Sequence, residues 1–329
     1  MSLNMYIGFG QDVISGDLTN ADQLRAALER ALSAFRQTDA AGRIKGMAQF
    51  IAQEKPEVVG LQEVSSIVLT RGTPDPGDDA PFVDYLGSLL GDIKDAGGPQ
   101  YMSFVQPNNT LDGVIDLVGS PEPFRFQEAD VILVRPDVPA QRVGTGLTYH
   151  TLLPIGRVLA SDGTIVNRSY VRGALHVRLT VEGKTVDVFN THLEVNGPGG
   201  IGTPVQNAQA MELLDYIQAD STAGASATVL TGDMNGRPDS LTHNLIAADG
   251  FKDTFAQVGQ GAGLTCCQAD LLDNTTDQAV ERIDYVFCKG SCDATESRVV
   301  LNTRVPRSTG GGQIWPSDHF SVLSALQFP

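Results

Sequence analysis

The sequence has 329 residues, of which 39 are acidic and 23 are basic, and its formal net charge is −16 at pH 7. So acidic a chain has no general electrostatic attraction for nucleic acids or anionic membranes, and a polyanionic substrate would need a local basic patch or a bound metal ion. Hydrophobic residues make up 41% of the chain. This composition excludes a disordered chain, and no apolar run approaches the ~20 residues that a membrane-spanning helix needs.

The N-terminal part of the sequence predicts two helices and a buried strand. Asn20 is a suitable N-cap for a helix whose apolar residues recur at helical spacing over 24–35. A second helical pattern covers 44–51 and ends before Pro56. The apolar run at 58–61 is typical of a buried strand.

The next stretch, residues 65–125, is rich in Gly, Pro and Asp. We therefore expect a long, loop-rich surface excursion that carries a helix near 82–94 and a strand near 101–106. Another strand is predicted at 129–134.

The rest of the chain mixes hairpins with strand–helix alternation. A hairpin is predicted from strands at 171–181 and 184–191, joined by a turn at Glu182 and Gly183. The later elements are a helix at 204–219, a strand at 227–231, a helix at 239–248 and strands at 282–288, 296–301 and 319–327. This mixture is typical of a layered α/β protein. Because neither an internal repeat nor a Pro/Ser-rich linker divides the sequence, we expect a single domain over residues 1–329.

The four cysteines lie in one late stretch, at Cys266, Cys267, Cys288 and Cys292. Two are adjacent and no His pair follows, so the spacing does not fit a zinc finger. Two alternatives stay open: one or two disulfides that tie a loop to a strand end, or four buried thiols. The sequence does not give the pairing. The opening residues 1–3 look like an added leader, so we expect the natural N-terminus, with any signal peptide, to have been removed.

Five short motifs place polar side chains where predicted strands end or begin. Glu63 follows the strand at 58–61, and His192 ends the strand at 184–191. Asp233 and Asn235 follow the strand at 227–231. Each of these motifs alone is as typical of a solvated strand end or an Asx turn as of a functional site.

The last two motifs have less ordinary placements. Asp284 lies two residues into an otherwise apolar strand, where an unpaired carboxylate would be costly. Asp318 and His319 stand side by side at the start of the final strand, so one of them can bind a metal ion while the other faces a substrate.

In this order, the five motifs resemble those of the endonuclease/exonuclease/phosphatase superfamily, from about residue 57 to the C-terminus. That superfamily includes pancreatic-type deoxyribonucleases, apurinic endonucleases, bacterial sphingomyelinases and inositol polyphosphate 5-phosphatases. The resemblance implies a four-layer αββα sandwich of two mostly antiparallel sheets flanked by helices. Its members begin with a strand that ends in Asn. Here only Asn4 could be that residue, at the end of a truncated first strand.

The resemblance also implies hydrolysis of a phosphodiester or phosphomonoester by water, with a divalent metal ion. A hard cation with oxygen ligands suits this chemistry, so we expect Mg²⁺, with Mn²⁺ or Ca²⁺ as alternatives. Glu63 is the first expected metal ligand, and Asp318 and Asn4 are the others.

The remaining motif residues receive catalytic roles by the same resemblance. Asp233 would orient or deprotonate the attacking water, and Asn235 would hydrogen-bond the phosphate. His192 and His319 would donate to the phosphate oxygens, and Asp284 would pair with His319 and keep it protonated. A second assignment makes His319 the general base, and the sequence does not separate the two.

Two further residues are candidate substrate contacts. Arg172 is expected to bind phosphate, because a guanidinium matches phosphate geometry. Asn108 lies in a loop that could overhang the site.

The favoured function is a metal-dependent phosphoesterase acting on a small-molecule or lipid phosphate ester. A nuclease of the same fold is the alternative, disfavoured because the basic residues are scattered. A non-catalytic binding protein ranks last, since it would need a lost catalytic position and all five motifs are intact. We expect a monomer without a membrane span, secreted or periplasmic.

Overall fold

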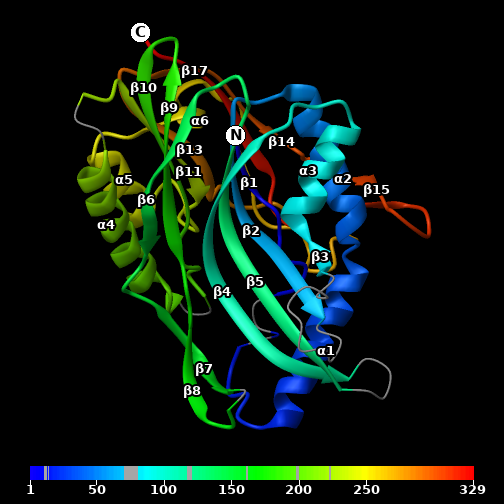
Figure 1. Cartoon of the computed structure of the whole chain (residues 1–329). Coiled ribbons are helices and arrows are strands. Elements are labelled where there is room, and N and C mark those ends of the chain that lie inside the picture. The colour runs from blue at the N-terminus through cyan, green and yellow to red at the C-terminus, as the bar shows by residue number, and fades with distance from the viewer. Residues whose placement is uncertain are drawn as a thin grey trace.

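The computed structural model describes residues 1–329 except 11, 12, 14, 70–80, 117–120, 161, 198–199 and 222–223. Two large β-sheets lie side by side at its centre, with helices on their outer faces (Figure 1).

The first sheet has seven strands in the order β14-β17-β1-β2-β5-β4, with β3 paired to β2. Its strands are β1 (Ser2–Asn4), β2 (Val58–Leu69), β3 (Pro81–Asp84), β4 (Met102–Asp116), β5 (Pro121–Val134), β14 (Asp293–Val300) and β17 (Ser321–Gln327). All its pairs are antiparallel except β1 with β2.

The second sheet has six strands in the order β12-β13-β11-β10-β9-β6. They are β6 (Ala140–Thr148), β9 (Gly173–Val181), β10 (Lys184–His192), β11 (Ala227–Asp233), β12 (Lys252–Asp253) and β13 (Asp284–Gly290). Only β10 and β11 pair in parallel. Two small two-stranded sheets join β7 (Leu153–Leu159) to β8 (Ile165–Tyr170) and β15 (Val305–Pro306) to β16 (Gln313–Ile314).

Three helices cover the first sheet and two cover the second (Figure 1). The helices are α1 (Ala21–Gln37), α2 (Ala40–Glu54), α3 (Tyr85–Asp95), α4 (Thr203–Asp220), α5 (Leu241–Ala248) and the short α6 (Thr254–Val258), which contacts β13 and β14. Among the described residues, no helix is both long enough and apolar enough to cross a membrane.

Strand alternation divides the apolar residues among the layers. On β10, Val188 points into the core between the two sheets, where it is clustered with Val134 of β5. Its neighbour Phe189 points the other way and packs with Leu213 of α4. Successive strand residues face opposite sides of a sheet, so a sheet buried on both faces needs such continuous apolar runs. The result is the predicted four-layer αββα arrangement, with mostly antiparallel pairing.

Most of the expected elements lie close to their predicted positions. The side chain of Asn20 accepts a hydrogen bond from the backbone N–H of Gln23 at 2.9 Å, which caps α1 as its sequence predicts. The β9–β10 turn has positive φ at Glu182 (50°) and Gly183 (78°), a combination suited to a tight hairpin.

The N-terminal half bears on two expectations. A short first strand ends at Asn4, as expected: Ser2–Asn4 form β1 between β2 and β17, and Leu3 is fully buried. The stretch 65–125 contains less loop than expected, because β2 continues to Leu69 and β4 and β5 form a long antiparallel pair. Residues 70–80 and 117–120 of that stretch lie outside the described residues.

The four cysteines form two disulfides, Cys266–Cys267 and Cys288–Cys292. The second closes the turn between β13 and β14. Of the two readings left open by the sequence, the structure therefore has disulfides. Cys288–Cys292 ties a loop to the end of β13, as one reading expected, whereas Cys266–Cys267 joins neighbours within a loop.

Candidate active site

A cleft of about 300 Å³ lies where the two sheets expose the ends of their parallel strands. Carboxyl ends of parallel strands are a common place for ligand sites. Six of the predicted site residues line this cleft: Glu63, His192, Asp233, Asn235, Asp318 and His319.

The second sheet supplies a row of polar side chains across three neighbouring strands. His192, the last residue of β10, is in register with Asp233, the last residue of β11, and Asp233 is in register with Asp284, the first residue of β13. The row is closely packed, with His192 Nε2 at 3.4 Å from Asp233 Oδ2. Asn235 has a positive φ of 49°, and its backbone N–H donates to Asp233 Oδ1 at 2.9 Å. The turn after β11 thus fixes the orientation of the Asp233 carboxylate.

The first sheet contributes Glu63 through a local distortion. The pairing of β2 with β5 shifts register between Leu61 and Val64, and Glu63 has a φ of 56°. Such bulges redirect a side chain, and backbone strain of this kind concentrates at functional sites. Asn4, at the end of β1, donates through Nδ2 to Glu63 Oε1 and to Asp233 Oδ2, both at 3.1 Å.

Asn4 therefore links the carboxylates of the two sheets, but it does so as a donor. Its side-chain oxygen accepts from the backbone N–H of Tyr6 at 2.9 Å. In this conformation Asn4 does not turn an oxygen toward the cleft, as a metal ligand would, but positions Glu63 and Asp233.

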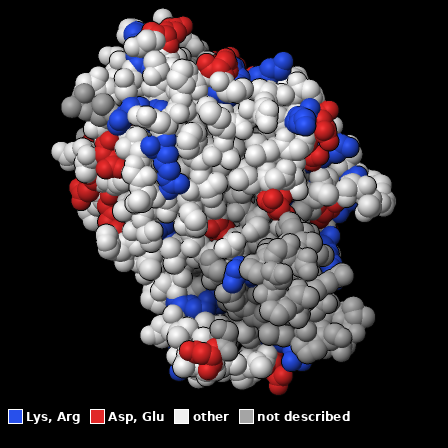
Figure 2. All heavy atoms as spheres, in the orientation of Figure 1, with Lys and Arg blue, Asp and Glu red and all other residues white. Residues whose placement is uncertain are grey.

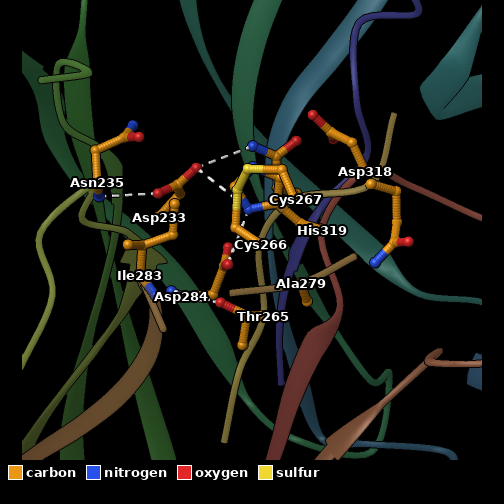
Figure 3. Close-up of a disulfide and its surroundings, with 12 residues drawn as sticks. Asp233, Asn235, Thr265, Cys266, Cys267, Ala279, Ile283, Asp284, Asp318 and His319 are labelled. Carbon is orange, nitrogen blue, oxygen red and sulfur yellow. Dashed lines mark hydrogen bonds and ion pairs between the residues drawn. A yellow bond between two sulfur atoms is a disulfide. The ribbon is translucent and has the colours of Figure 1, made fainter. Parts of the chain in front are cut away.

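His319 completes the site from the segment before β17. Its Nδ1 lies 2.8 Å from Asp284 Oδ2 and 3.6 Å from Asp233 Oδ2 (Figure 3). Burial opposes the charged form of His319, but the carboxylates of Asp284, Asp318 and Asp233 raise its pKa well above the usual value. The expected pairing of Asp284 with His319 is present, and it favours the imidazolium.

The carboxylates around the cleft are held in an unfavourable environment. Burial, followed by repulsion from Asp318, raises the pKa of Glu63 to about 7. Burial, followed by repulsion from Asp284, raises the pKa of Asp233 to about 7. The pKa of Asp318 is raised as well, chiefly by burial. A cation would relieve this repulsion.

These donors fit the expected divalent ion. Glu63 and Asp318 both line the cleft and offer carboxylate oxygens, the ligands that Mg²⁺ prefers. Behind them, Asp284 Oδ1 is buried and has no hydrogen-bond partner among the described residues, which adds to the negative field at the site.

Arg172 and Asn108 lie elsewhere than expected. Arg172 is fully buried behind His192 and does not line the cleft. Its Nη1 donates to Glu128 Oε1 at 3.2 Å and contacts His192 Nδ1 at 2.7 Å. A phosphate in the cleft would meet His192 first, so the interpretation of Arg172 as a phosphate contact is not supported by its position.

Asn108 lies in the bulge of β4 between Pro107 and Thr110 rather than in a loop over the cleft. Its Nδ2 donates to Asp130 Oδ2 at 2.9 Å, and it is absent from the cleft lining. The sequence could not show this, because the polar run around Asn108 looks like a loop although it is part of a long strand.

Three side chains of this region were missed. Glu128 on β5 holds Arg172, Tyr6 lines the cleft with a φ of 61°, and Cys267 lines it beside Cys266. A signal existed only for Glu128, a charged residue directly before the strand predicted at 129–134. Tyr6 and the adjacent cysteines belong to no motif of the site.

Burial, then the neighbouring cations Arg172 and His319, lower the pKa of His192 well below its ordinary value. Because a guanidinium can only donate, Nδ1 of this neutral imidazole accepts and its proton is on Nε2. Nε2 lies 3.4 Å from Asp233 Oδ2, which can accept that proton, and 3.1 Å from Asn235 Nδ2, which donates to the backbone oxygen of Leu193 instead. His192 is thus a neutral donor toward the cleft, whereas His319 is a charged one.

A model of the Endonuclease/Exonuclease/phosphatase family matches residues 3–319 of this chain. No curated protein matches the sequence significantly.

Several solved structures are similar in fold. A family protein from Leptotrichia buccalis is 18% identical over 87% of this chain and 93% of its own, with a TM-score of 0.56. The mannosyl-6-phosphatase Bt3783 of Bacteroides thetaiotaomicron is 18% identical over 99% of this chain and 98% of its own, with a TM-score of 0.56. Truncated TDP2 of Caenorhabditis elegans is 18% identical over 88% of this chain and 91% of its own, with a TM-score of 0.53.

Proposed function

The chain belongs to the endonuclease/exonuclease/phosphatase family, and on that basis we propose that it is a divalent-metal-dependent phosphoesterase that uses water as the nucleophile. One observation carries the proposal. Six residues from four separate sequence motifs line one cleft, where carboxylates that suit a cation face two imidazoles that can donate to a phosphate.

We propose Glu63 and Asp318 as the residues that would hold the metal ion, with Mg²⁺ as the natural choice. Bound there, the ion would neutralise charge on the phosphate and polarise its phosphorus–oxygen bonds. Asn4 positions Glu63 and Asp233 by donating to both.

The other side chains divide the work of water attack. Asp233, with one oxygen fixed by Asn235 N–H, accepts the proton of the attacking water. His192 donates from Nε2 and His319 donates as an imidazolium to phosphate oxygens that gain charge in the transition state. Asn235 hydrogen-bonds the phosphate without adding negative charge.

Small or lipid-derived phosphate esters suit this molecule better than nucleic acid. The net charge is −16, and on the described part of the face in Figure 2 the basic side chains are scattered rather than joined in a stripe. A duplex lying across such a surface would meet repulsion outside the cleft. The similar fold of a mannosyl-6-phosphatase is compatible with a monoester substrate, and that of TDP2 with another phosphate ester.

We further propose a monomer that is secreted or periplasmic. Two disulfides suit an oxidising compartment. Size-exclusion chromatography with light scattering tests the first part, and fractionation of the native host tests the second.

A hydrolysis panel tests the function. It contains sugar phosphates, inositol phosphates, sphingomyelin, RNA and plasmid DNA, each with Mg²⁺, Mn²⁺, Ca²⁺ or excess chelator. We expect metal-dependent turnover of a small or lipid ester. DNA cleavage that persists at moderate salt would favour the nuclease instead, and no turnover of any ester would favour a non-catalytic binding protein.

A further inference from the structure

The Cys266–Cys267 pair lies directly against the catalytic imidazole. Both residues line the cleft, with Cys266 buried and Cys267 exposed. Figure 3 shows the disulfide beside His319, with Sγ of Cys266 at 3.5 Å from Nε2 of His319. The backbone holds the disulfide in this place, because Cys266 forms isolated antiparallel β-bridges to both Glu281 and His319.

His319 has the arrangement of a metal-binding histidine. Its Nδ1 is engaged by Asp284 at 2.8 Å, which leaves Nε2 directed at the sulfur. Histidines that bind metals usually donate the other ring N–H to a carboxylate, which fixes the ring and raises its basicity.

We propose that, when the disulfide is reduced, Cys266, Cys267 and His319 form a site for a thiophilic divalent cation such as Zn²⁺. One ligand atom from each of the three lies within 4.8 Å of the other two. A tetrahedral zinc ion with bonds of ~2.3 Å to sulfur and ~2.0 Å to nitrogen separates those two atoms by ~3.5 Å. This matches the distance between Cys266 Sγ and His319 Nε2. The fourth position would face the cleft.

The site would exist only in one redox state. A dithiol reductant supplies two electrons and two protons, becomes a cyclic disulfide, and leaves two thiols at Cys266 and Cys267. The cation then binds the two thiolates and Nε2 of His319, and the two thiol protons and the Nε2 proton of the imidazolium pass to the buffer. In the oxidised protein both sulfurs are bonded to each other and cannot act as thiolate ligands.

Occupation of this site would remove the donor of His319, so a thiophilic cation would inhibit the reduced enzyme; this consequence rests on the proposed function. The site at Cys266, Cys267 and His319 is separate from the proposed Mg²⁺ site, because Glu63 and Asp318 are hard oxygen donors whereas thiolates select soft ions.

The second disulfide provides a matched control. Cys288 and Cys292 are buried in a cluster with Ala227 at the far ends of β11 and β13. They belong to neither metal-ligand group found among the described residues. Reducing the protein frees all four thiols, so only position distinguishes the pairs.

The test is anaerobic titration of the reduced full chain with Co²⁺, monitored by the thiolate-to-cobalt charge-transfer band and the visible bands of tetrahedral Co²⁺. We expect one equivalent to bind to the reduced parent and to the reduced C288S/C292S variant, and Zn²⁺ to displace it. The oxidised parent and the C266S/C267S variant should show no charge-transfer band. His319→Gln should keep the band but weaken binding at least 10-fold.

Circular dichroism establishes whether each variant is folded. If C266S/C267S is not folded, the single variant C267S, at an exposed position, replaces it. C267S should lose part of the charge-transfer band. No band in the reduced parent, or an unchanged band in C266S/C267S or C267S, would overturn the proposal. Absorbance needs no turnover, so failure of the proposed phosphoesterase function leaves this result readable. In an active enzyme, equimolar Zn²⁺ should inhibit the reduced form at least 10-fold more than the oxidised form.

Discussion

Nη1 of Arg172 lies 2.7 Å from Nδ1 of His192, and both side chains are buried from solvent. The guanidinium can only donate, so it fixes the imidazole proton on Nε2, the atom that faces the cleft. Arg172 thereby acts as a positioning residue for His192. The carboxylate of Glu128, with Oε1 at 3.2 Å from Nη1 of Arg172, balances the charge of the guanidinium.

Arg172→Met should free the tautomer of His192. We expect kcat to fall about 10²-fold with little change in KM, because only the donor in the transition state is misplaced. Loss of the buried Arg172–Glu128 pair should also cost about 3–5 kcal/mol of stability. Imidazole ¹H–¹⁵N NMR spectra should show one tautomer in the parent and a mixture in the variant.

Arg178→Met is the matched control, because Arg178 of β9 pairs with buried Asp187 of β10 and neither residue lines the cleft. It should lose stability and keep the His192 tautomer. An unchanged tautomer and kcat in Arg172→Met would refute the positioning role.

His192→Ala should lower kcat about 10²–10⁴-fold, the range typical of a positioned donor. The matched variant His150→Ala should leave the rate unchanged, since the His150 side chain is 90% exposed, pairs with Glu212 and does not line the cleft. Steady-state kinetics in Mg²⁺ checks both. Equal rates for His192→Ala and the parent would remove His192 from the mechanism.

Glu63→Gln should abolish stabilisation by Mg²⁺. Without metal, Glu63 is buried beside other carboxylates and its pKa is raised to about 7, so a bound cation should stabilise the folded chain. At an ion concentration of 100 times Kd, this linkage amounts to about 2.7 kcal/mol. Thermal denaturation with Mg²⁺ or chelator measures it, and the exposed Glu29→Gln on α1 is the control. The same Mg²⁺ shift in Glu63→Gln would place the ion elsewhere.

The pH profile should show which group is the general base. Asp233 must lose its proton to accept one from water, so kcat/KM should rise with pH and then level off. Without metal the pKa of Asp233 is raised to about 7, and a bound cation lowers it, so the rise should be centred at or below pH 7. The rate should fall again only where His319 loses its proton, well above its ordinary pKa. A rise that is centred well above 7 would instead assign the general base to His319.

Asp284→Asn sharpens this test. Removal of one negative charge should lower the pKa of both Asp233 and His319, because Asp284 raises each of them. Both limbs of the profile should then move to lower pH, as initial-rate measurements would show. A profile that does not move would mean that Asp284 is not electrostatically coupled to the reaction.

Much of the site could be predicted because its residues belong to short motifs at strand ends. His192, Asp233 and Asp284 each terminate or begin an apolar strand, and strand register alone then aligns them. The strand and helix patterns indicated a layered α/β protein, and the resemblance of the motifs to the family implied the four-layer arrangement.

What could not be predicted depends on long-range packing. Arg172 was expected to bind phosphate, because nothing in the sequence indicates that Glu128 of β5 pairs with it in the interior. The sequence predicts a loop at Asn108, because the strand that contains it has a bulge and many polar side chains. The proximity of Cys266 to His319 joins segments 53 residues apart, and no periodicity in the sequence reports such a contact.

The most direct test of the proposed phosphoesterase mechanism is the initial rate of hydrolysis of p-nitrophenyl phosphate and bis-p-nitrophenyl phosphate by the parent and Asp233→Asn, with Mg²⁺ or excess chelator. The mechanism predicts that the parent turns over at least one ester only with metal, and that Asp233→Asn loses about 10²–10⁴-fold in kcat. Hydrolysis that is the same after chelation, or the same in Asp233→Asn, would contradict it.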